Sequence, residues 1–501
     1  MAARAWRRSP AAAIVLLLLA YGAVWLATCA ATSLSPPVDN LEQLTWQHSL
    51  EWGYYKHPPL PTVLAWLAVK AMGPGAWTTY LLGASLTLAS LAIFWLLLRE
   101  LRGARHATIA LFAALCVTFY NGRLNYYNHN VVLLVIVSAA AFVCWRAHRE
   151  RSWRAWALLG VLFGLGALSK YQVAVTGVSA AVFWCTQRGW RDPVLRGGAL
   201  LAILVALVIW APHLAWLRHH GFPTIDYAME SSLGARNSLA GSVIGALEWT
   251  ADALLNRALP AILLLLATWA LATRRGAATA ARGGRAPTGP SAERALILSW
   301  GLVPLLFMPL VGVAFGSELQ LQWATPFLLF AIPCAMEFAP PGTWERARLA
   351  TALKAFLAMQ VLLLAVDVLT SPMSPLPSRS RPHWRNFPGE QLAADIGAQA
   401  VQRLGAPVRI IIGPQGEGGV LALHLPGDPL LLIDGRYDRS PWVTPAMVQA
   451  QGAVELATAR EAKPGWLPVG ARFPHLYWRT RAPATEVAAS PDRDPATLAS
   501  P

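Results

Sequence analysis

The stretch VDNLEQLTWQHSLEWGYYKHPPLP, residues 38–61, follows directly after the first long apolar segment of the chain. It carries two acids, Asp39 and Glu42, near its start and the pair Lys56 and His57 before its prolines. The chain as a whole is poor in charge, because only 13% of its residues are Asp, Glu, Lys or Arg. Charge gathered where such a chain leaves an apolar segment indicates a binding or catalytic site at a membrane surface.

The composition indicates an α-helical membrane protein. Of the 501 residues, 55% are hydrophobic and only 13% are charged. Soluble domains carry about 25% charged residues. Apolar runs of about 17–25 residues alternate with short basic clusters, as in polytopic proteins. The formal net charge is +15, but the arginines lie between apolar runs rather than along one soluble face, so we expect no nucleic-acid partner. The five cysteines show no metal or disulfide spacing and are expected to be packing residues.

The alternation of basic and arginine-poor connections predicts about eleven membrane spans. The apolar runs lie at 11–32, 76–98, 106–120, 130–145, 154–169, 171–186, 198–217, 258–272, 295–314, 324–338 and 349–370. The positive-inside rule assigns the arginine-rich connections, among them the N-terminus and the Gly/Ala/Arg/Pro-rich linker 274–294, to the cytoplasm. We therefore expect the first charged loop and everything after residue 370 to lie outside the cytoplasm.

A change of composition after residue 370 predicts the domain limits. Residues 1–370 are expected to form a transmembrane domain, 371–480 a small extracytoplasmic α/β domain, and 481–501 a disordered tail. Within the second part, VRIIIG and PLLLID have the composition of buried strands, and the helix-like GEGGVLALHL lies between them. This order predicts a β-α-β unit over about 390–435.

The charged loop has a predicted local structure of its own. The segment LEQLTWQHSLEW, residues 41–52, has its leucines at helical spacing, which predicts an amphipathic helix lying at the membrane surface. The prolines that follow would end this helix and begin the next one, since proline is tolerated in a first turn. A carboxylate at one end of the helix and two basic side chains at the other suit a phosphate-bearing lipid and a nucleophilic acceptor.

An acid just after the first membrane helix, followed by GYYKHPPL, resembles the membrane glycosyltransferases of the GT-C fold. The similarity is to bacterial members of families 39 and 83, which are related to protein O-mannosyltransferases and lipid A aminoarabinose transferases. The stretches GLGALSKYQV, IWAPHLAWLRHHGF, LQWATPFLLF and AVQRLGAPVRIIIG also resemble segments of that family. Together they cover nearly the whole chain.

The resemblance implies both a fold and an activity. The fold would be a polytopic α-helical GT-C domain with a small C-terminal α/β domain. The enzyme would transfer a sugar from a polyprenyl-phosphate-linked donor to an acceptor on the periplasmic face of the inner membrane. The acceptor would be lipid A, another lipid, a polysaccharide or a protein. No cofactor is implied, and the need for a divalent metal is left open.

The resemblance also implies roles for single residues. Asp39 matches the first-loop acid, which is proposed to deprotonate the acceptor or to orient the donor phosphate. Lys56 and Lys170 are expected beside the leaving lipid phosphate. Lys170 stands amid an apolar run, where a lysine is costly unless it serves a site or reaches the surface from a helix end. His57 either helps to bind phosphate or caps the turn at Pro58.

The sequence departs from the family pattern in the next outer loop. Many relatives carry a second acid there, whereas NGRLNYYNHNVVLL has Asn130 at the corresponding place and Asn128 nearby. Asparagine cannot act as a base, so a mechanism with two carboxylates is in doubt. Asn130 is expected to bind the sugar or the phosphate, and Arg123 to supply positive charge. Glu42, one helical turn from Asp39, either supplies a second carboxylate or faces solvent.

The loop 218–236 gathers basic and acidic side chains, among them His219 and His220. Their spacing is not a metal-ligand motif, so no metal site is predicted. His219 either contacts the donor or the acceptor, or belongs to a solvated loop.

A secondary transporter or flippase is the alternative class, because it would share the hydropathy and the lysine within an apolar run. Transporters usually contain two matching halves, and no internal repeat is visible here. The unusual polar residues also gather at one face. A ligase or polymerase acting on lipid-linked polysaccharide is a nearer alternative. The sequence therefore favours a lipid-linked sugar transferase with membrane lipids as its surroundings.

Overall fold

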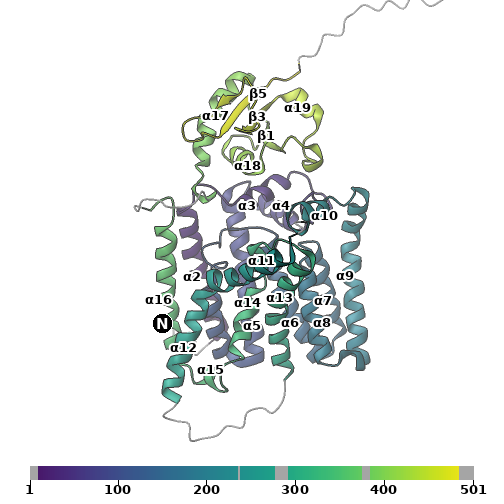
Figure 1. Cartoon of the computed structure of the whole chain (residues 1–501), viewed down its shortest axis with the longest axis vertical. Helices are drawn as coiled ribbons and strands as arrows, with labels where there is room; N and C mark the ends of the chain where they lie inside the picture. Colours follow the sequence, from purple (N-terminus) through teal and green to yellow (C-terminus); the bar gives the residue numbers. More distant parts are fainter. Residues whose placement is uncertain (1–8, 235–236, 277–290, 375–383, 485–501) are drawn as a thin grey trace, which may run out of the picture. The chain divides into compact units, whose positions relative to one another are not determined.

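The structure is a computed structural model that describes residues 9–234, 237–276, 291–374 and 384–484 (Figure 1). It divides into two compact units, Met1–Phe387 and Pro388–Pro501. The domain limits predicted at residues 370 and 480 stay predictions. The N-terminal arginines before residue 9, most of the linker 274–294 and the tail after residue 484 lie outside the described residues.

The first unit is helical, and its elements are numbered as in Figure 1. They are α2 (Pro10–Ala31), α3 (Val38–Trp46), α4 (Leu60–Met72), α5 (Ala76–Ala114), α6 (His129–Glu150), α7 (Trp153–Ala167), α8 (Val173–Thr186), η1 (Gly189–Arg191), α9 (Pro193–His219), α10 (Pro223–Ala228), η2 (Met229–Leu233), α11 (Leu239–Ala251), η3 (Asp252–Arg257), α12 (Leu259–Gly276), α13 (Ala292–Phe315), η4 (Leu321–Ala324), α14 (Leu328–Met336), α15 (Thr343–Arg346), α16 (Leu349–Leu369) and η5 (Trp384–Asn386).

Six helices among the described residues are long and apolar enough to cross a membrane: α2, α5, α6, α9, α13 and α16. The pair formed by Leu239–Arg257 and Leu259–Ala272 passes the same test as one span bent by 61°. Helices α4, α7 and α8 are apolar but shorter. The prediction of a multi-pass α-helical membrane protein is confirmed, and the predicted number of about eleven spans stays a prediction.

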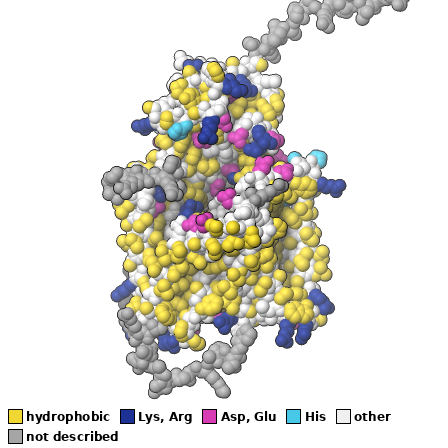
Figure 2. All heavy atoms as spheres, viewed as in Figure 1, with side chains coloured by type: hydrophobic (Ala, Val, Ile, Leu, Met, Phe, Trp, Pro, Cys, Tyr) yellow, Lys and Arg dark blue, Asp and Glu magenta, His cyan; other side chains and the backbone are white. Residues whose placement is uncertain are grey.

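Helix α5 joins two of the predicted apolar runs. The break between them is a kink at Gly103, whose φ of 82° lies in the left-handed region that favours glycine. On the face shown in Figure 2, the first unit presents a broad hydrophobic band, with several Lys and Arg side chains along its lower edge. Side chains such as Val208, which is 73% exposed, form this band. The band is what a bilayer requires of a lipid-facing surface.

The second unit contains the predicted β-α-β pattern. Its elements are α17 (Gly389–Leu404), β1 (Ile410–Gly413), α18 (Gln415–His424), β2 (Leu430–Ile433), η6 (Tyr437–Arg439), α19 (Pro445–Gln451), β3 (Ala453–Thr458), β4 (Leu467–Pro468) and β5 (Leu476–Arg481). The strands form one sheet in the order β2-β1-β3-β5-β4. Strand β1 pairs in parallel with β2 and β3, and β5 pairs antiparallel with β3 and β4. The β-branched and leucine residues of β1 and β2 are largely buried, as expected for strands of a parallel pair whose faces are covered.

The amphipathic helix predicted over 41–52 is wrong in its bounds and in the exposure of its apolar face. Helix α3 ends at Trp46, and its residues 40–46 are all buried. Leu41 and Leu44 pack inside the protein, whereas Leu50 lies after the helix and is 46% exposed. Helix α11 has the amphipathic character instead, because Leu239 and Leu247 are 71% and 65% exposed while Trp249 is buried. It runs across the direction of α9 and α16 in Figure 1.

Helix α5 and the loop before α6 approach each other closely at Gly83. A Cβ atom on Gly83 would overlap the carbonyl oxygen of Tyr126 in that loop. We expect Gly83→Ala to destabilise the protein by about 1–3 kcal/mol, because the loop backbone would have to move. A lower melting temperature in detergent checks this. Gly177→Ala is the matched control, since no atom lies within 4 Å of its Cβ position; equal melting temperatures for the two variants would contradict the prediction.

Candidate active site

Asn40 fixes the position of α3 against the loop that precedes α6. It is fully buried, and its Nδ2 donates to the carbonyl of Asn125 and to Thr79 Oγ1, both at 2.9 Å. Its Oδ1 accepts from the backbone N of Tyr127 at 2.9 Å. All the polar atoms of a buried amide are therefore satisfied, and Asp39, the preceding residue, is held beside this loop.

The turn that carries Lys56 is fixed in a similar way. The backbone N of Tyr54 donates to the carbonyl of His57 at 3.0 Å, and the Tyr54 ring stacks on Trp46 with centroids 4.6 Å apart. After the prolines, the backbone N of Leu60 donates to the carbonyl of Leu168 at 2.8 Å. This bond brings the break between α7 and α8 next to the start of α4, and Lys170 lies in that break.

Two asparagines link Asp39 to Lys170. Asn128 Nδ2 donates to Asp39 Oδ2 at 2.8 Å, and its Oδ1 caps α6 by accepting from the backbone N of Asn130 and Val131. Asn130 Oδ1 in turn accepts from Lys170 Nζ at 2.7 Å. Asn130, which was predicted to bind substrate, therefore contacts Lys170, which was predicted to bind the phosphate. Asn128, which the sequence analysis noted only as a neighbour, is the residue that contacts Asp39.

Glu42 and Lys56 form an ion pair with Nζ and Oε2 2.8 Å apart. Glu42 is 3% exposed, so the interpretation of this residue as a solvated helix face is wrong. Burial alone would lower the pKa of Lys56, but the charges of Glu42 and Asp39 outweigh it and raise the pKa. Lys56 therefore keeps its proton.

Lys170 lies in a different environment from Lys56. Its amino group contacts the neutral Asn130 amide and lies 5.6 Å from the centre of the Trp323 ring. Burial lowers its pKa to about 7; the charge of Asp39 opposes this effect and that of Lys56 adds to it. Lys170 thus changes its charge near neutral pH, whereas Lys56 does not.

His57 lies against His129, with ring centroids 3.9 Å apart. Burial lowers the pKa of His57 well below its usual value, and His129 and the two lysine charges act in the same direction. Among the described residues, the possible metal-ligand atoms of Glu42, His57 and His129 lie within 4.8 Å of one another. Carboxylate and imidazole groups are ligand types that suit a metal ion. The nearby lysine charges favour an anion over a cation at this place.

The structure thus brings six of the eight predicted site residues into one group: Asp39, Glu42, Lys56, His57, Asn130 and Lys170. We call these six residues the charge cluster. It places the partly buried Asp39 carboxylate beside two partly buried amino groups. Such an arrangement can bind a phosphate and, next to it, accept a proton from a hydroxyl group.

Two predicted residues lie elsewhere. His219 is exposed at the end of α9, where its ring contacts His220. The histidine of α9 that the structure connects to the site is the buried His213, which the sequence analysis did not select. Its Nδ1 bonds the Trp52 carbonyl at 2.6 Å and its Nε2 the Tyr171 hydroxyl at 2.7 Å. Arg123 lines a separate cavity.

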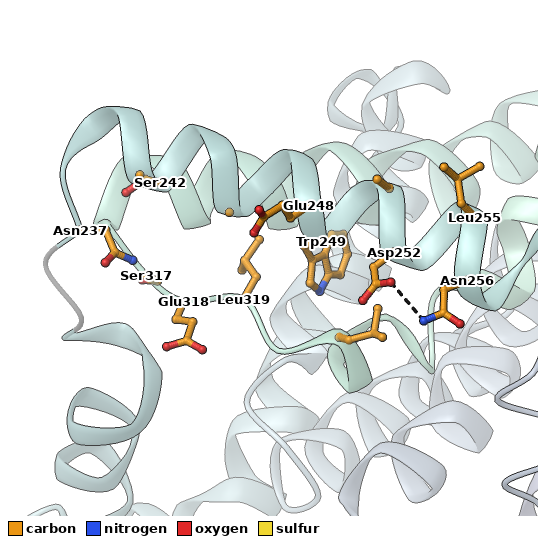
Figure 3. A pocket seen from close by; sticks show the side chains of 14 residues that line it. Asn237, Ser242, Glu248, Trp249, Asp252, Leu255, Asn256, Ser317, Glu318 and Leu319 are labelled. Carbon is orange, nitrogen blue, oxygen red and sulfur yellow. Dashed lines mark hydrogen bonds between the residues drawn. The ribbon is translucent and has the colours of Figure 1, made fainter. Parts of the chain in front are cut away.

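A further cavity of about 830 Å³ lies along the polar side of α11 (Figure 3). Glu248 and Asp252 reach it from the helices, and Glu318 from the loop after α13. Asn256 Nδ2 donates to Asp252 Oδ1 at 3.1 Å. Its acidic wall and its size, within the range of about 300–1,000 Å³ of ligand pockets, suit a polar ligand.

Comparisons with known proteins agree with this architecture. The family model described as dolichyl-phosphate-mannose-protein mannosyltransferase matches residues 56–216. The chain is similar to the lipopolysaccharide core galacturonosyltransferase RgtA of Rhizobium johnstonii, with 25% identity over 457 residues that cover 88% of this chain and 85% of that protein. RgtB of the same organism is 25% identical over 224 residues, 44% of each chain.

The crystal structure of ArnT from Cupriavidus metallidurans in the apo state has a similar fold, with a TM-score of 0.63. It is 16% identical, and the match covers 94% of this chain and 98% of that one. The structure of the same protein bound to undecaprenyl phosphate gives a TM-score of 0.60 at 16% identity, over 95% and 99% of the two chains. The predicted GT-C fold and the predicted enzyme class, a membrane glycosyltransferase, are confirmed, and the transporter alternative is disfavoured.

Proposed function

We propose that this membrane glycosyltransferase of the GT-C fold transfers a sugar from a polyprenyl-phosphate-linked donor to an acceptor at the periplasmic face of the inner membrane. The observation that carries the proposal is the charge cluster, in which the Asp39 carboxylate lies close enough to Lys56 and Lys170 to interact electrostatically with both amino groups. The N-terminus would lie in the cytoplasm and the C-terminal unit in the periplasm. Among the acceptors expected from the sequence, a lipopolysaccharide glycan is favoured by the similarity to RgtA.

Three residues of the cluster, Asp39, Lys56 and Lys170, take part directly in the proposed reaction. Lys56 and Lys170 bind the phosphate that links the lipid to the sugar. The acceptor hydroxyl attacks the anomeric carbon while Asp39 takes its proton, and the bond from that carbon to the phosphate oxygen breaks. The polyprenyl phosphate leaves with the bonding electron pair, and the lysine charges stabilise it. One direct displacement of this kind inverts the anomeric centre.

Other residues position those that react. Asn128 orients the Asp39 carboxylate through its 2.8 Å hydrogen bond. Glu42 holds the Lys56 amino group within reach of the phosphate. Asn130 does the same for Lys170 without adding a charge of its own. A second acid in its place would compete with the phosphate for that lysine.

Binding of undecaprenyl phosphate to the purified full chain tests the proposal. The wild type is expected to bind it saturably, and Lys56→Met or Lys170→Met to weaken binding by roughly 10- to 100-fold, as for hydrogen bonds to charged groups. Asp39→Asn should bind as the wild type does. Lys70→Met is the control, because Lys70 is exposed and lies over Trp66. Absence of saturable binding to the wild type would overturn the proposal.

Donor binding is expected to depend on pH through Lys170. Its pKa is lowered to about 7, so the lysine is charged below that pH and neutral above it. The affinity of the wild type for undecaprenyl phosphate should therefore be highest in mildly acidic buffer and fall as the pH rises through about 7 and beyond. In Lys170→Arg the cation persists, so the fall should disappear. Dissociation constants measured across this pH range check the prediction; a flat wild-type profile would contradict it.

A further inference from the structure

The cavity that contains Arg123 has a volume of about 460 Å³, and its lining includes no residue of the charge cluster. Helix α2, the loop before α6, the end of η3 and η5 line it. The size falls within the range of about 300–1,000 Å³ of small-molecule sites. Trp25, Tyr126 and Trp384 contribute aromatic walls, which are surfaces that sugar rings pack against.

Two arginines in this cavity have no acidic partner within salt-bridge distance among the described residues. Arg123 and Arg257 both lie over the Phe119 ring, with guanidinium carbons 5.7 and 5.1 Å from its centre. They are close enough to repel each other electrostatically, and Asp252 opposes only part of that effect at Arg257. Arg385, in the same cavity, is by contrast paired with Asp367 at 3.1 Å.

Further polar groups of the cavity residues are also without a protein partner in the described part of the chain. Arg257 Nε, Thr118 Oγ1 and Trp384 Nε1 are buried and make no hydrogen bond there. Buried donors are almost always paired, so a cavity that gathers several unpaired ones indicates a ligand with oxygen acceptors. Two adjacent guanidinium groups favour a planar or tetrahedral oxyanion, which each can bind through two parallel N–H groups.

The cavity lies near one member of the charge cluster, Asp39. Pro37, two residues before Asp39, lines it, and so does Tyr126. Asp39 and Arg123 both act electrostatically on the Tyr126 hydroxyl, so both lie near this side chain. A sugar whose anomeric carbon or attacking hydroxyl lies at Asp39 can therefore extend toward the arginines.

We propose that Arg123 and Arg257 form a binding site for an oxyanion carried by a sugar substrate, so that the enzyme acts on an acidic glycan. This deepens the proposed function and rests on it. Two sources supply the same chemistry: the carboxylate of a uronic acid on the donor, or a phosphate on the acceptor glycan. The first source agrees with the galacturonosyl transfer for which RgtA, a protein similar to this chain, is named.

The test uses the purified full chain with matched charged and uncharged substrates. The donors are undecaprenyl-phosphate-linked galacturonic acid and galactose, and the acceptors are phosphorylated and dephosphorylated lipopolysaccharide core. Arg123→Gln and Arg257→Gln remove one charge each, and Arg257→Lys keeps the charge but not the paired N–H groups. Arg218→Gln is the control, because Arg218 is exposed at the end of α9.

The expected result is a loss of discrimination between charged and uncharged substrates. If the donor carries the anion, kcat/KM for the galacturonic acid donor falls roughly 10- to 100-fold in both glutamine variants, while that for the galactose donor is unchanged. If the acceptor carries it, the same fall appears only with the phosphorylated core. Variants that keep the wild-type ratio for both pairs, or lower every rate equally, would overturn the proposal.

Binding of undecaprenyl phosphate tests the proposed function separately from the arginine site. Undecaprenyl phosphate carries no sugar, so its binding reports on the lysines and should be unchanged in Arg123→Gln and Arg257→Gln. A wild type that binds this lipid but shows no preference for either charged substrate would sink the arginine site alone. A wild type that fails to bind the lipid would sink the lipid-phosphate donor, whatever the arginine variants do.

Discussion

Asp39→Asn is expected to lower the rate of sugar transfer by about 10²- to 10⁴-fold, the usual contribution of a general base, while the donor still binds. The asparagine oxygen can accept the same hydrogen bond from Asn128 that the carboxylate accepts now, so the geometry of α3 should persist. The proton of the acceptor hydroxyl, however, would have no carboxylate to receive it, because Glu42 is engaged with Lys56. Single-turnover transfer with saturating donor measures the effect.

The control for this variant is Asp226→Asn, which changes an exposed acid in α10 and should transfer at the wild-type rate. A binding measurement on Asp39→Asn separates the chemical step from donor recognition. Retention of more than about a tenth of the wild-type rate would show that Asp39 is not the base. Loss of undecaprenyl phosphate binding would assign Asp39 to the phosphate site instead.

Lys56→Met is expected to have two large effects with different causes. Transfer should fall by about 10²- to 10³-fold, the usual loss when one donor to a developing anion is removed. Stability should also fall by about 3–5 kcal/mol, because the variant leaves the buried Glu42 carboxylate without its partner. The first effect belongs to the reaction and the second to folding, so a single variant cannot separate them.

The double variant Lys56→Met/Glu42→Gln separates the two effects. It removes the orphaned charge, so the melting temperature should return toward that of the wild type while transfer stays low. Glu42→Gln alone keeps the lysine and should retain more activity than either variant that lacks it. A double variant that regains transfer together with stability would show that Lys56 acts only by folding the loop.

The sequence predicted the membrane class, the GT-C fold and the enzyme class, because hydropathy, arginine placement and ordered motifs are properties of the chain alone. It did not predict the burial of α3, since leucines at helical spacing mark an apolar face without saying whether protein or lipid covers it. Helix α11 was not predicted, because it lies between two of the predicted apolar runs, 198–217 and 258–272.

The contacts within the charge cluster were beyond prediction for a different reason. Lys170 meets Asn130 because the Leu60 backbone bonds the Leu168 carbonyl, and such a bond between distant segments leaves no trace in local composition. Arg257 and Arg123 are more than a hundred residues apart in the sequence, so local composition does not indicate their proximity either. The predicted roles of the cluster residues stay predictions, whereas their proximity is a property of the structure.

The charge cluster draws all its members from residues 39–170, whereas Arg257 and the acidic cavity along α11 come from residues after 236. This separation has an evolutionary consequence. Mutations after residue 236 can alter which glycan is accepted without touching the groups that handle the lipid phosphate, so substrate preference is free to diverge while the chemistry is inherited. A chimera that exchanges only the segment after residue 236 is expected to keep its binding of undecaprenyl phosphate and to change its discrimination between charged and uncharged sugars, because it replaces Arg257 and leaves Arg123 in place.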